Sequence, residues 1–278
     1  AMQLSETGSS ITQNIEANKV PEFDFDVSAQ KYTQILDANQ DTLKNVATAS
    51  LTSYSGAKSS SVDTELSLNK EIKRLSVKPK FSSAIKPGAY KLHLTLRTLE
   101  GEVDIEQDFT WGVIAVNTNK SIYEPGETAK IGFGILNDNG ETQCMTGKNS
   151  AQVTAIITAP DGSKSEVSTD KGTIKDSGEC AAISVTNQAD FQTTYKTGGN
   201  GLYTISVTAS IKDGPTRTLS DYFKVDDTAT FAIERNDFPT RIYPGAPYFV
   251  AFKLKAKEAY KGTVEEIVPN NFQIGSIN

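Results

Sequence analysis

Apolar and polar residues alternate with a period of two along much of this chain. In the clearest run, Tyr90, Leu92 and Leu94 share one face, while the residues between them are polar. A period of two is typical of a strand with one buried and one solvated face. Segments rich in Thr, Val, Ile, Ser and Tyr recur elsewhere and favour further strands. Residues 29–47 offer a turn or two at helical spacing and are interpreted as an irregular loop. We therefore predict an all-β chain.

This alternating run occurs twice. Residues 88–109 are matched by residues 201–222, and corresponding positions lie 113 residues apart without a gap. Each copy holds a glycine-containing turn between two alternating segments, which predicts a hairpin made of the last two strands of a domain. A repeat of this length has the size of one β-sandwich. We predict tandem immunoglobulin-like antiparallel β-sandwiches, strung head to tail.

The repeat divides the chain into four parts. Residues 1–19 are polar and are predicted to be a flexible leader. Residues 20–111 and 112–226 are each predicted to form one sandwich. Residues 227–278 are interpreted as part of a third immunoglobulin-like β domain, because the Tyr-Pro-Gly sequence at 243–245 echoes a turn near the start of the second sandwich.

The junctions between these parts are short. No linker rich in Gly or Ser separates the first two sandwiches, and the chain passes through Trp111 directly into the next strand. Short junctions limit bending, so the array is expected to behave as a semi-rigid rod. Trp111, the only tryptophan, is interpreted as packing between domains; the alternative is a role in stacking against a ligand.

Two cysteines, Cys144 and Cys180, lie in the second sandwich. Each follows a turn-forming segment, so both are expected at strand or loop ends, where a disulfide can form. In the chain-entropy model, closing such a loop stabilises the fold by ~3–4 kcal/mol. The alternative is two separate reduced thiols, since the only histidine, His93, belongs to another domain and leaves too few ligands for structural zinc. A disulfide implies an exported, extracellular or cell-surface location.

Charge and hydropathy exclude two classes of partner. The formal net charge of −6 is spread along the chain, and no basic stripe with interleaved aromatic residues is present. Nucleic-acid binding is therefore not expected. No apolar run approaches the ~20 residues that cross a bilayer, so this segment is not expected to insert into a membrane.

Catalytic motifs are scarce. His93 lies on the polar face of a predicted strand, and the chain contains no Gly-x-Ser-x-Gly motif. Glu102, Asp104 and Glu106 alternate on a neighbouring strand, an arrangement typical of a solubilising face. We expect no enzymatic activity and nominate no catalytic residue.

One segment resembles the opening of a calcium loop. Asp37, Asn39 and Asp41 occupy alternate positions, as the first three ligands of such a loop do. The expected glycine at position six is Thr42, and the expected glutamate at position twelve is Thr48. An Asx-rich turn without a cofactor is the favoured interpretation, and calcium binding is the alternative.

Two segments carry a family resemblance. Residues 119–128 read Asn-Lys-Ser-Ile-Tyr-Glu-Pro-Gly-Glu-Thr, and residues 153–162 end in Pro-Asp-Gly. Together they resemble the macroglobulin-type (MG2-like) sandwich of bacterial and animal alpha-2-macroglobulins, over residues 113–165. The resemblance implies that residues 112–226 form a macroglobulin-like sandwich. Residues 263–269 look like repeat domains of large bacterial surface proteins. The thioester sequence Cys-Gly-Glu-Gln of the macroglobulins does not occur in this chain.

These features predict a non-catalytic structural or adhesive segment of an exported bacterial multidomain surface protein. Its expected partners are the other domains of the parent protein, which it spaces or presents, and a cell-surface protein or glycan ligand. One alternative is the N-terminal domain stack of a macroglobulin-like protease inhibitor. Another is a carbohydrate-binding accessory module, which the aromatic content of 8% disfavours.

Overall fold

The computed structural model divides the chain into two units. The first consists of residues 1–112 with 138–140, and the second of residues 113–137 with 141–278. The structure describes the whole chain except residues 18, 54–59, 81–85, 148–149, 181–185, 238, 242–246, 248, 264, 266–267, 269–272 and 278.

Strands dominate both units. The described residues of the first unit contain β1 (Met2–Leu4), β2 (Ser9–Ile15), β3 (Phe23–Asp26), β4 (Ala47–Ser53), β5 (Ser60–Val62), β6 (Thr64–Asn69), β7 (Arg74–Pro79), β8 (Gly88–Thr98) and β9 (Gly101–Trp111). Those of the second contain β10 (Ile114–Thr118), β11 (Ile122–Tyr123), β12 (Thr128–Ile135), β13 (Ala151–Thr158), β14 (Lys164–Ser168), β15 (Lys175–Asp176), β16 (Phe191–Lys196), β17 (Gly201–Ile211), β18 (Thr216–Val225), β19 (Phe231–Arg235) and β20 (Phe252–Ala256).

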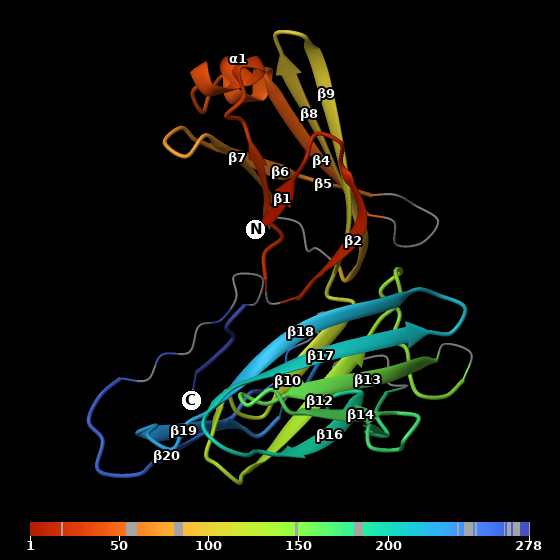
Figure 1. Ribbon diagram of the computed structural model, residues 1–278, viewed down its shortest axis with the longest axis vertical. Helices are drawn as coiled ribbons and strands as arrows, with labels where there is room; N and C mark the ends of the chain where they lie inside the picture. The colour runs from red at the N-terminus through yellow and green to blue at the C-terminus, as the bar shows by residue number, and fades with distance from the viewer. Residues whose placement is uncertain are drawn as a thin grey trace. The chain divides into compact units, whose positions relative to one another are not determined.

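The two sandwiches have the same strand order in their sheets (Figure 1). The sheets of the first unit have the orders β1-β3-β7-β6 and β2-β9-β8-β4-β5. In the second unit the orders are β10-β12-β16-β15 and β11-β18-β17-β13-β14, which is the same sequence of equivalent strands. The direction differs at one edge, since β1 pairs parallel with β3 whereas β10 pairs antiparallel with β12. Two largely antiparallel sheets in this order are typical of an immunoglobulin-like sandwich. The predicted all-β, immunoglobulin-like fold is confirmed.

The repeated hairpins are β8–β9 and β17–β18, but their second strands are offset by one residue from the predicted match. Tyr90 pairs with Phe109, and the equivalent Tyr203 pairs with Phe223 rather than with Tyr222. Tyr222 is 66% exposed, whereas Phe223 is buried. The turn of the second hairpin contains one more residue, and a shift of one residue reverses which face each side chain occupies.

Residues 1–19 do not form the predicted flexible leader. Strand β1 pairs parallel with β3, and β2 pairs parallel with β9. Met2 and Leu4 are both buried in the first sandwich. These strands are short and mostly polar, so their own sequence gives a weak signal; hydrogen bonds to the neighbouring strands hold them.

Helical turns occupy part of residues 29–47, which the sequence led us to interpret as an irregular loop. A 3₁₀ turn at Gln30–Tyr32 leads into α1 (Thr33–Asp37), and a second 3₁₀ turn follows at Leu43–Asn45. Tyr32 and Ile35 are buried, so the helical spacing of apolar residues does face the core. The side chains of Tyr32 and Ile35 thus form part of the core of the first sandwich.

A tyrosine corner closes each sandwich at equivalent positions. The hydroxyl of Tyr90 donates to the carbonyl oxygen of Lys86, and that of Tyr203 donates to the carbonyl oxygen of Gly199 at 3.0 Å. In immunoglobulin-like domains such a hydroxyl ties the chain back to the backbone a few residues upstream. The repeated tyrosine in the sequence therefore makes the same hydrogen bond in both sandwiches.

Removing either corner hydroxyl is expected to weaken its own unit. Tyr90→Phe loses the bond to Lys86, and Tyr203→Phe loses both the bond to Gly199 and the one that its hydroxyl accepts from Gly198 N at 3.1 Å. Each lost bond is expected to lower the free energy of unfolding by about 1 kcal/mol. Chemical denaturation of each variant measures this loss. Tyr222→Phe, at an exposed position on β18, serves as the control, and an equal loss there would refute a specific role for the corner.

Residues 227–278 are counted with the second unit. Their described strands β19 and β20 pair antiparallel, and Arg235 N donates to Asn119 O of the sandwich at 2.9 Å. The turn predicted at 243–245 and most of the motif at 263–269 lie outside the described residues. Assignment of this segment to a third domain stays a prediction.

Candidate functional site

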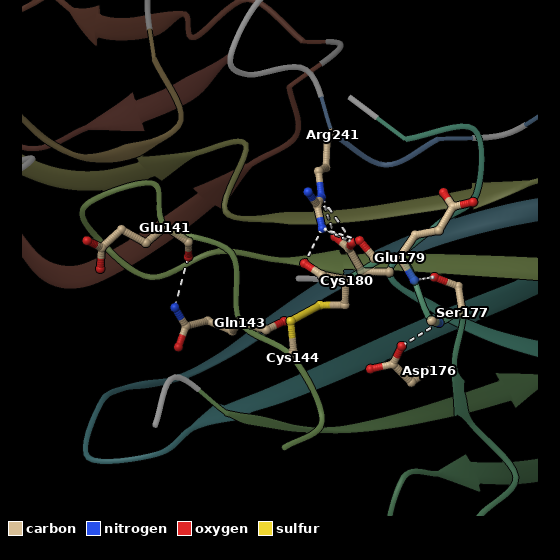
Figure 2. Close-up of a disulfide and its surroundings, with 10 residues drawn as sticks. Glu141, Gln143, Cys144, Asp176, Ser177, Glu179, Cys180 and Arg241 are labelled. Atoms are coloured by element: carbon tan, nitrogen blue, oxygen red, sulfur yellow. Dashed lines mark hydrogen bonds and ion pairs between the residues drawn. A yellow bond between two sulfur atoms is a disulfide. The ribbon is translucent and has the colours of Figure 1, made fainter. Parts of the chain in front are cut away.

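Cys144 and Cys180 form a disulfide in the second unit, with their Cα atoms 5.7 Å apart. Cys144 lies in the connection between β12 and β13, and Cys180 lies in the connection between β15 and β16 (Figure 2). Backbone hydrogen bonds fix the position of Cys144 in the sandwich: Gln143 N donates to Ile135 O and Ala151 N donates to Cys144 O, both at 2.8 Å. The disulfide therefore ties the β15–β16 connection to a well-anchored part of the sandwich.

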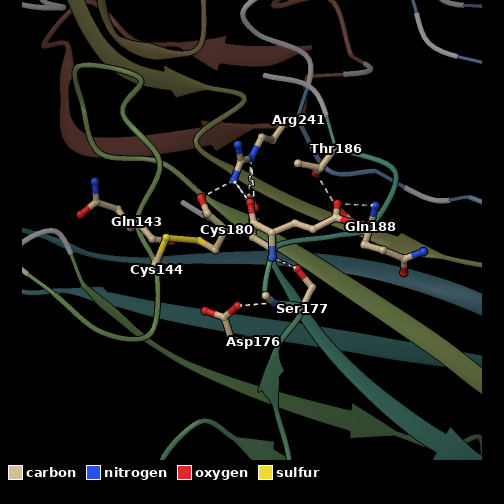
Figure 3. A network of polar contacts seen from close by, with 11 residues as sticks. Gln143, Cys144, Asp176, Ser177, Cys180, Thr186, Gln188 and Arg241 are labelled. Atoms are coloured by element: carbon tan, nitrogen blue, oxygen red, sulfur yellow. Dashed lines mark hydrogen bonds and ion pairs between the residues drawn. A yellow bond between two sulfur atoms is a disulfide. The ribbon is translucent and has the colours of Figure 1, made fainter. Parts of the chain in front are cut away.

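Arg241 is buried beside this disulfide (Figure 3). Its Nε donates to the two carboxylate oxygens of Asp190 at 3.0 and 3.2 Å. Its Nη2 donates to the carbonyl oxygen of Glu179 at 3.3 Å and to that of Cys180. Buried charges are tolerated where hydrogen bonds satisfy them, and the planar guanidinium fork provides several donors at once. We call Cys144, Cys180, Glu179, Asp190 and Arg241 the Arg241 cluster.

The acceptors of Arg241 come from both ends of the β15–β16 connection. Ser177 N donates to Asp190 O at 3.1 Å, which joins the two ends. Glu179 N donates to Ser177 Oγ at 3.2 Å, and Thr186 Oγ1 donates to Gln188 O at 2.7 Å. Figure 3 shows Ser177, Thr186 and Gln188 near the disulfide. The two ends of the connection are thus joined by a backbone hydrogen bond and by Arg241, and the disulfide links the connection to Cys144.

Electrostatics within the cluster act in opposite directions on Asp190. Burial raises the pKa of its carboxyl above the ordinary value, and the negative charges of Asp176 and Glu179 add to the rise. The hydrogen bond and positive charge of Arg241 lower the pKa. Arg241 is therefore the group that favours the ionised form of this buried carboxyl.

Replacing Arg241 with methionine is expected to raise the pKa of Asp190 further, because only the effects that raise it remain. Because the folded state binds this proton more tightly than the unfolded state, the protonated carboxyl adds to the free energy of unfolding at pH values below the unfolded pKa. This contribution is lost as the pH rises through the higher folded pKa, so the variant should lose stability over that pH range. An NMR titration of the Asp190 carboxyl, with unfolding measured across the same pH range, tests this. An unchanged pKa would show that Arg241 does not act on Asp190.

The segment that resembles macroglobulins forms a second hydrogen-bonded network. Tyr123 OH donates to Asn119 Oδ1 at 2.8 Å, and Lys130 N donates to the same oxygen at 2.9 Å. Asn119 Nδ2 donates to Glu234 Oε1 at 3.1 Å. The tyrosine and asparagine of residues 119–128 therefore have a structural role: they join β10, β11 and β12 and contact the segment after β18.

His93 lies on a solvated face, as its position in the alternation predicts. Its imidazole faces Asp104 at 3.6 Å and Glu106 at 3.4 Å on β9. A hydrogen bond from Lys91 lowers the pKa of Glu106. A polar depression of about 270 Å³ at this face is lined by Thr7, Gly8, Ser9, Lys91, Asp104, Glu106 and Asp108.

The candidate calcium residues lie around a turn. Asp37 is the last residue of α1. Asn39 Oδ1 accepts hydrogen bonds from Thr42 N at 2.9 Å and from Thr42 Oγ1 at 3.0 Å, and Asn39 N donates to Thr42 Oγ1 at 2.9 Å, which is the reciprocal pattern of a capping box. In the part of the chain that the structure describes, no group of three or more His, Cys, Asp or Glu residues is placed to hold a metal ion. Neither Asp37 nor Asp41 thus belongs to such a group.

Trp111 is buried at the end of β9. Its indole Nε1 donates to the carbonyl oxygen of Lys19 at 2.9 Å, within the first unit. The proposed packing of this side chain between domains stays a prediction.

Sequence reasoning missed Asp190 and Arg241. Neither belongs to a motif, and 51 positions separate them. A weak signal was present, since Asp190 directly precedes the apolar start of β16, where an unpaired acid would be unfavourable. Its partner could not be inferred, because Arg241 comes from a segment with no regular alternation.

Comparisons with known proteins give structural likenesses only. No family model matches the chain, and no curated protein matches it. One matching structure is a titin fragment known from its anomalous substructure, with 12% identity and a TM-score of 0.22, covering 78% of this chain and 95% of that chain. Another is a chimeric titin Z1Z2 carrying an exogenous KLER peptide from decorin, with 10% identity and a TM-score of 0.21, covering 77% and 91%. The fold assignment rests on the sheets of this chain.

Proposed function

We propose that this chain is a non-catalytic structural segment of an exported multidomain protein, in which serial sandwiches space or present other domains. The observation that carries the proposal is the parallel pairing of terminal strands in both units. Strand β2 runs parallel to β9, and β11 runs parallel to β18. Each unit thus places a strand near its beginning against its last sandwich strand.

This pairing suits a domain that carries load. When the two ends of a unit are pulled apart, parallel neighbours slide along each other, so their hydrogen bonds are loaded together rather than one after another. In the second unit these bonds include Lys224 N to Ser121 O at 3.0 Å and Asp226 N to Tyr123 O at 2.8 Å. Breaking several bonds at once requires more force than opening them singly.

The covalent junction is also short. Strand β9 ends at Trp111 and β10 begins at Ile114, which leaves two residues between consecutive sandwiches. A linker of this length restricts the range of orientations available to its domains. This supports a role in spacing.

Export and family are part of the same proposal. The disulfide supports an oxidising, extracellular location. Among the described residues, no helix is long and apolar enough to cross a membrane. The sequence resemblance of residues 113–165 supports a macroglobulin-type second sandwich, and the bacterial surface protein that would carry it is part of the proposal. Adhesion to a surface protein or a glycan would be the work of the domains or loops presented.

Single-molecule pulling on the full chain tests the mechanical role. Two separate unfolding events are expected, one for each unit. Lys224→Pro removes the donor to Ser121, so the unfolding force of the second unit should fall well below its wild-type value, while that of the first unit stays unchanged and serves as the internal control. An unchanged force for the second unit would refute the load-bearing role of this strand pair.

A further inference from the structure

Residues 239–241 are docked on the second sandwich. Asn117 Nδ2 donates to the carbonyl oxygen of Pro239 at 2.7 Å. Thr240 is buried against Gly134 on β12, so closely that a Cβ at Gly134 would lie 2.6 Å from Thr240 Oγ1. Arg241 follows and enters the Arg241 cluster. Residues 239, 240 and 241 thus each contact the sandwich.

The disulfide positions part of the receptor for Arg241. The guanidinium binds the carbonyl oxygens of Glu179 and Cys180 as well as the carboxylate of Asp190. Asp190 directly precedes β16 and is held by the sheet. The two carbonyl groups belong to the connection itself: one is that of Cys180, which is cross-linked to Cys144, and the other is that of Glu179, the residue before it. Figure 2 shows the guanidinium directed at the Cys180 carbonyl, next to the S–S bond.

Loss of the cross-link weakens this receptor through conformational entropy. Without it, the backbone at Glu179 and Cys180 must be ordered each time Arg241 docks, and ordering backbone is unfavourable. A guanidinium is buried at low cost only where several acceptors are already in place. The same residue can return to water if the segment undocks, because it lies in a connection rather than in a strand.

We propose that the Cys144–Cys180 disulfide is a redox-sensitive latch for this segment. The oxidised form holds residues 239–241 on the second sandwich, and reduction releases them while the sandwich stays folded. The latch is independent of the mechanical role proposed above, since it requires no load on the chain.

The reductant is a low-molecular-weight thiol. Its thiolate attacks the sulfur of Cys144, because this residue is partly exposed whereas Cys180 is buried. The protein S–S bond breaks, Cys180 leaves as a thiolate and takes up a proton, and Cys144 is held in a mixed disulfide. A second thiol attacks this intermediate, which frees Cys144 and yields the oxidised reductant. Two electrons and two protons reach the protein in total.

Native-state trypsin digestion of the full chain tests the latch. Trypsin cleaves after arginine, and Arg241 is protected only while it is docked. In the oxidised chain, cleavage after Arg241 is expected to be slow; reduction with dithiothreitol should accelerate it at least about tenfold, and reoxidation should restore protection. Arg217 is buried in β18 and reports unfolding of the sandwich itself, so it should stay protected under all of these conditions.

Two variants separate docking from the disulfide. Arg241→Lys keeps a trypsin site but loses the guanidinium fork, and Gly134→Ala places a methyl group against Thr240; both should be cleaved rapidly at position 241 in the oxidised state. Reduction should then add little. Continued protection of Arg241 after reduction would overturn the latch, as would parallel loss of protection at Arg217. Protection of Gly134→Ala at Arg241 would show that docking does not use this contact and would also overturn the model.

Discussion

Replacing Phe223 with alanine is expected to lower the free energy of unfolding of the second unit by about 3–5 kcal/mol. The ring is buried and stacks on Tyr203, with centroids 5.1 Å apart. It also meets Tyr123 edge-on at 5.2 Å. Truncation therefore removes a large apolar surface and leaves a cavity between the two sheets, where neighbouring rings cannot collapse freely. Circular dichroism during chemical denaturation measures the loss.

The adjacent residue provides the matched control. Tyr222→Ala removes a ring of similar size from the same strand, but this ring is 66% exposed, so a change within about 0.5 kcal/mol is expected. Trp111 is the only tryptophan and lies in the first unit. The transition followed by its fluorescence should be the same in both variants. Equal losses at positions 222 and 223 would contradict the strand register described here.

Removing the disulfide is the second large effect. The Cys144→Ala, Cys180→Ala double variant should lose about 3–4 kcal/mol of stability in the second unit, because the cross-link joins residues separated by 36 positions and restricts the unfolded chain. Circular dichroism should show an earlier transition for this unit. The unfolding of the first unit, followed through Trp111, should be unchanged.

A simple addition of reductant to the wild-type chain serves as the companion experiment. It should reproduce the midpoint of the double variant and should have no effect on that variant. If reduction leaves the midpoint of the wild-type chain unchanged, the cross-link does not stabilise the second sandwich, and its role would be confined to local order in the β15–β16 connection.

Much of the fold was predictable from local patterns. The alternation at Tyr90, Leu92 and Leu94 indicated a strand, and all three side chains are buried. The repeat indicated two similar domains, and the two units do share one strand order. The gap-free alignment of the two hairpins wrongly paired Phe109 with Tyr222. The true equivalent is the neighbouring Phe223, and because both residues are aromatic the shift by one position does not show in the sequence. Sequence identity in a strand does not by itself report which face is buried.

Short strands were harder to predict. Residues 1–19 form β1 and β2, yet few apolar side chains mark them. They are stabilised by hydrogen bonds to β3 and β9 and, in β1, by the burial of Met2 and Leu4. A segment that is stabilised by its neighbours carries little information about its own structure.

The sequence by itself determined the class of fold, the internal repeat and the two residues that form the disulfide, because each depends on periodicity or on a rare residue type. Only the tertiary structure decided what lies beside that disulfide. Asp190 and Arg241 form an ion pair because the packing of two connections against a sheet brings them together, and no local pattern encodes that contact. Backbone periodicity is a short-range property, whereas the pairing of buried charges is decided by the packing of distant segments.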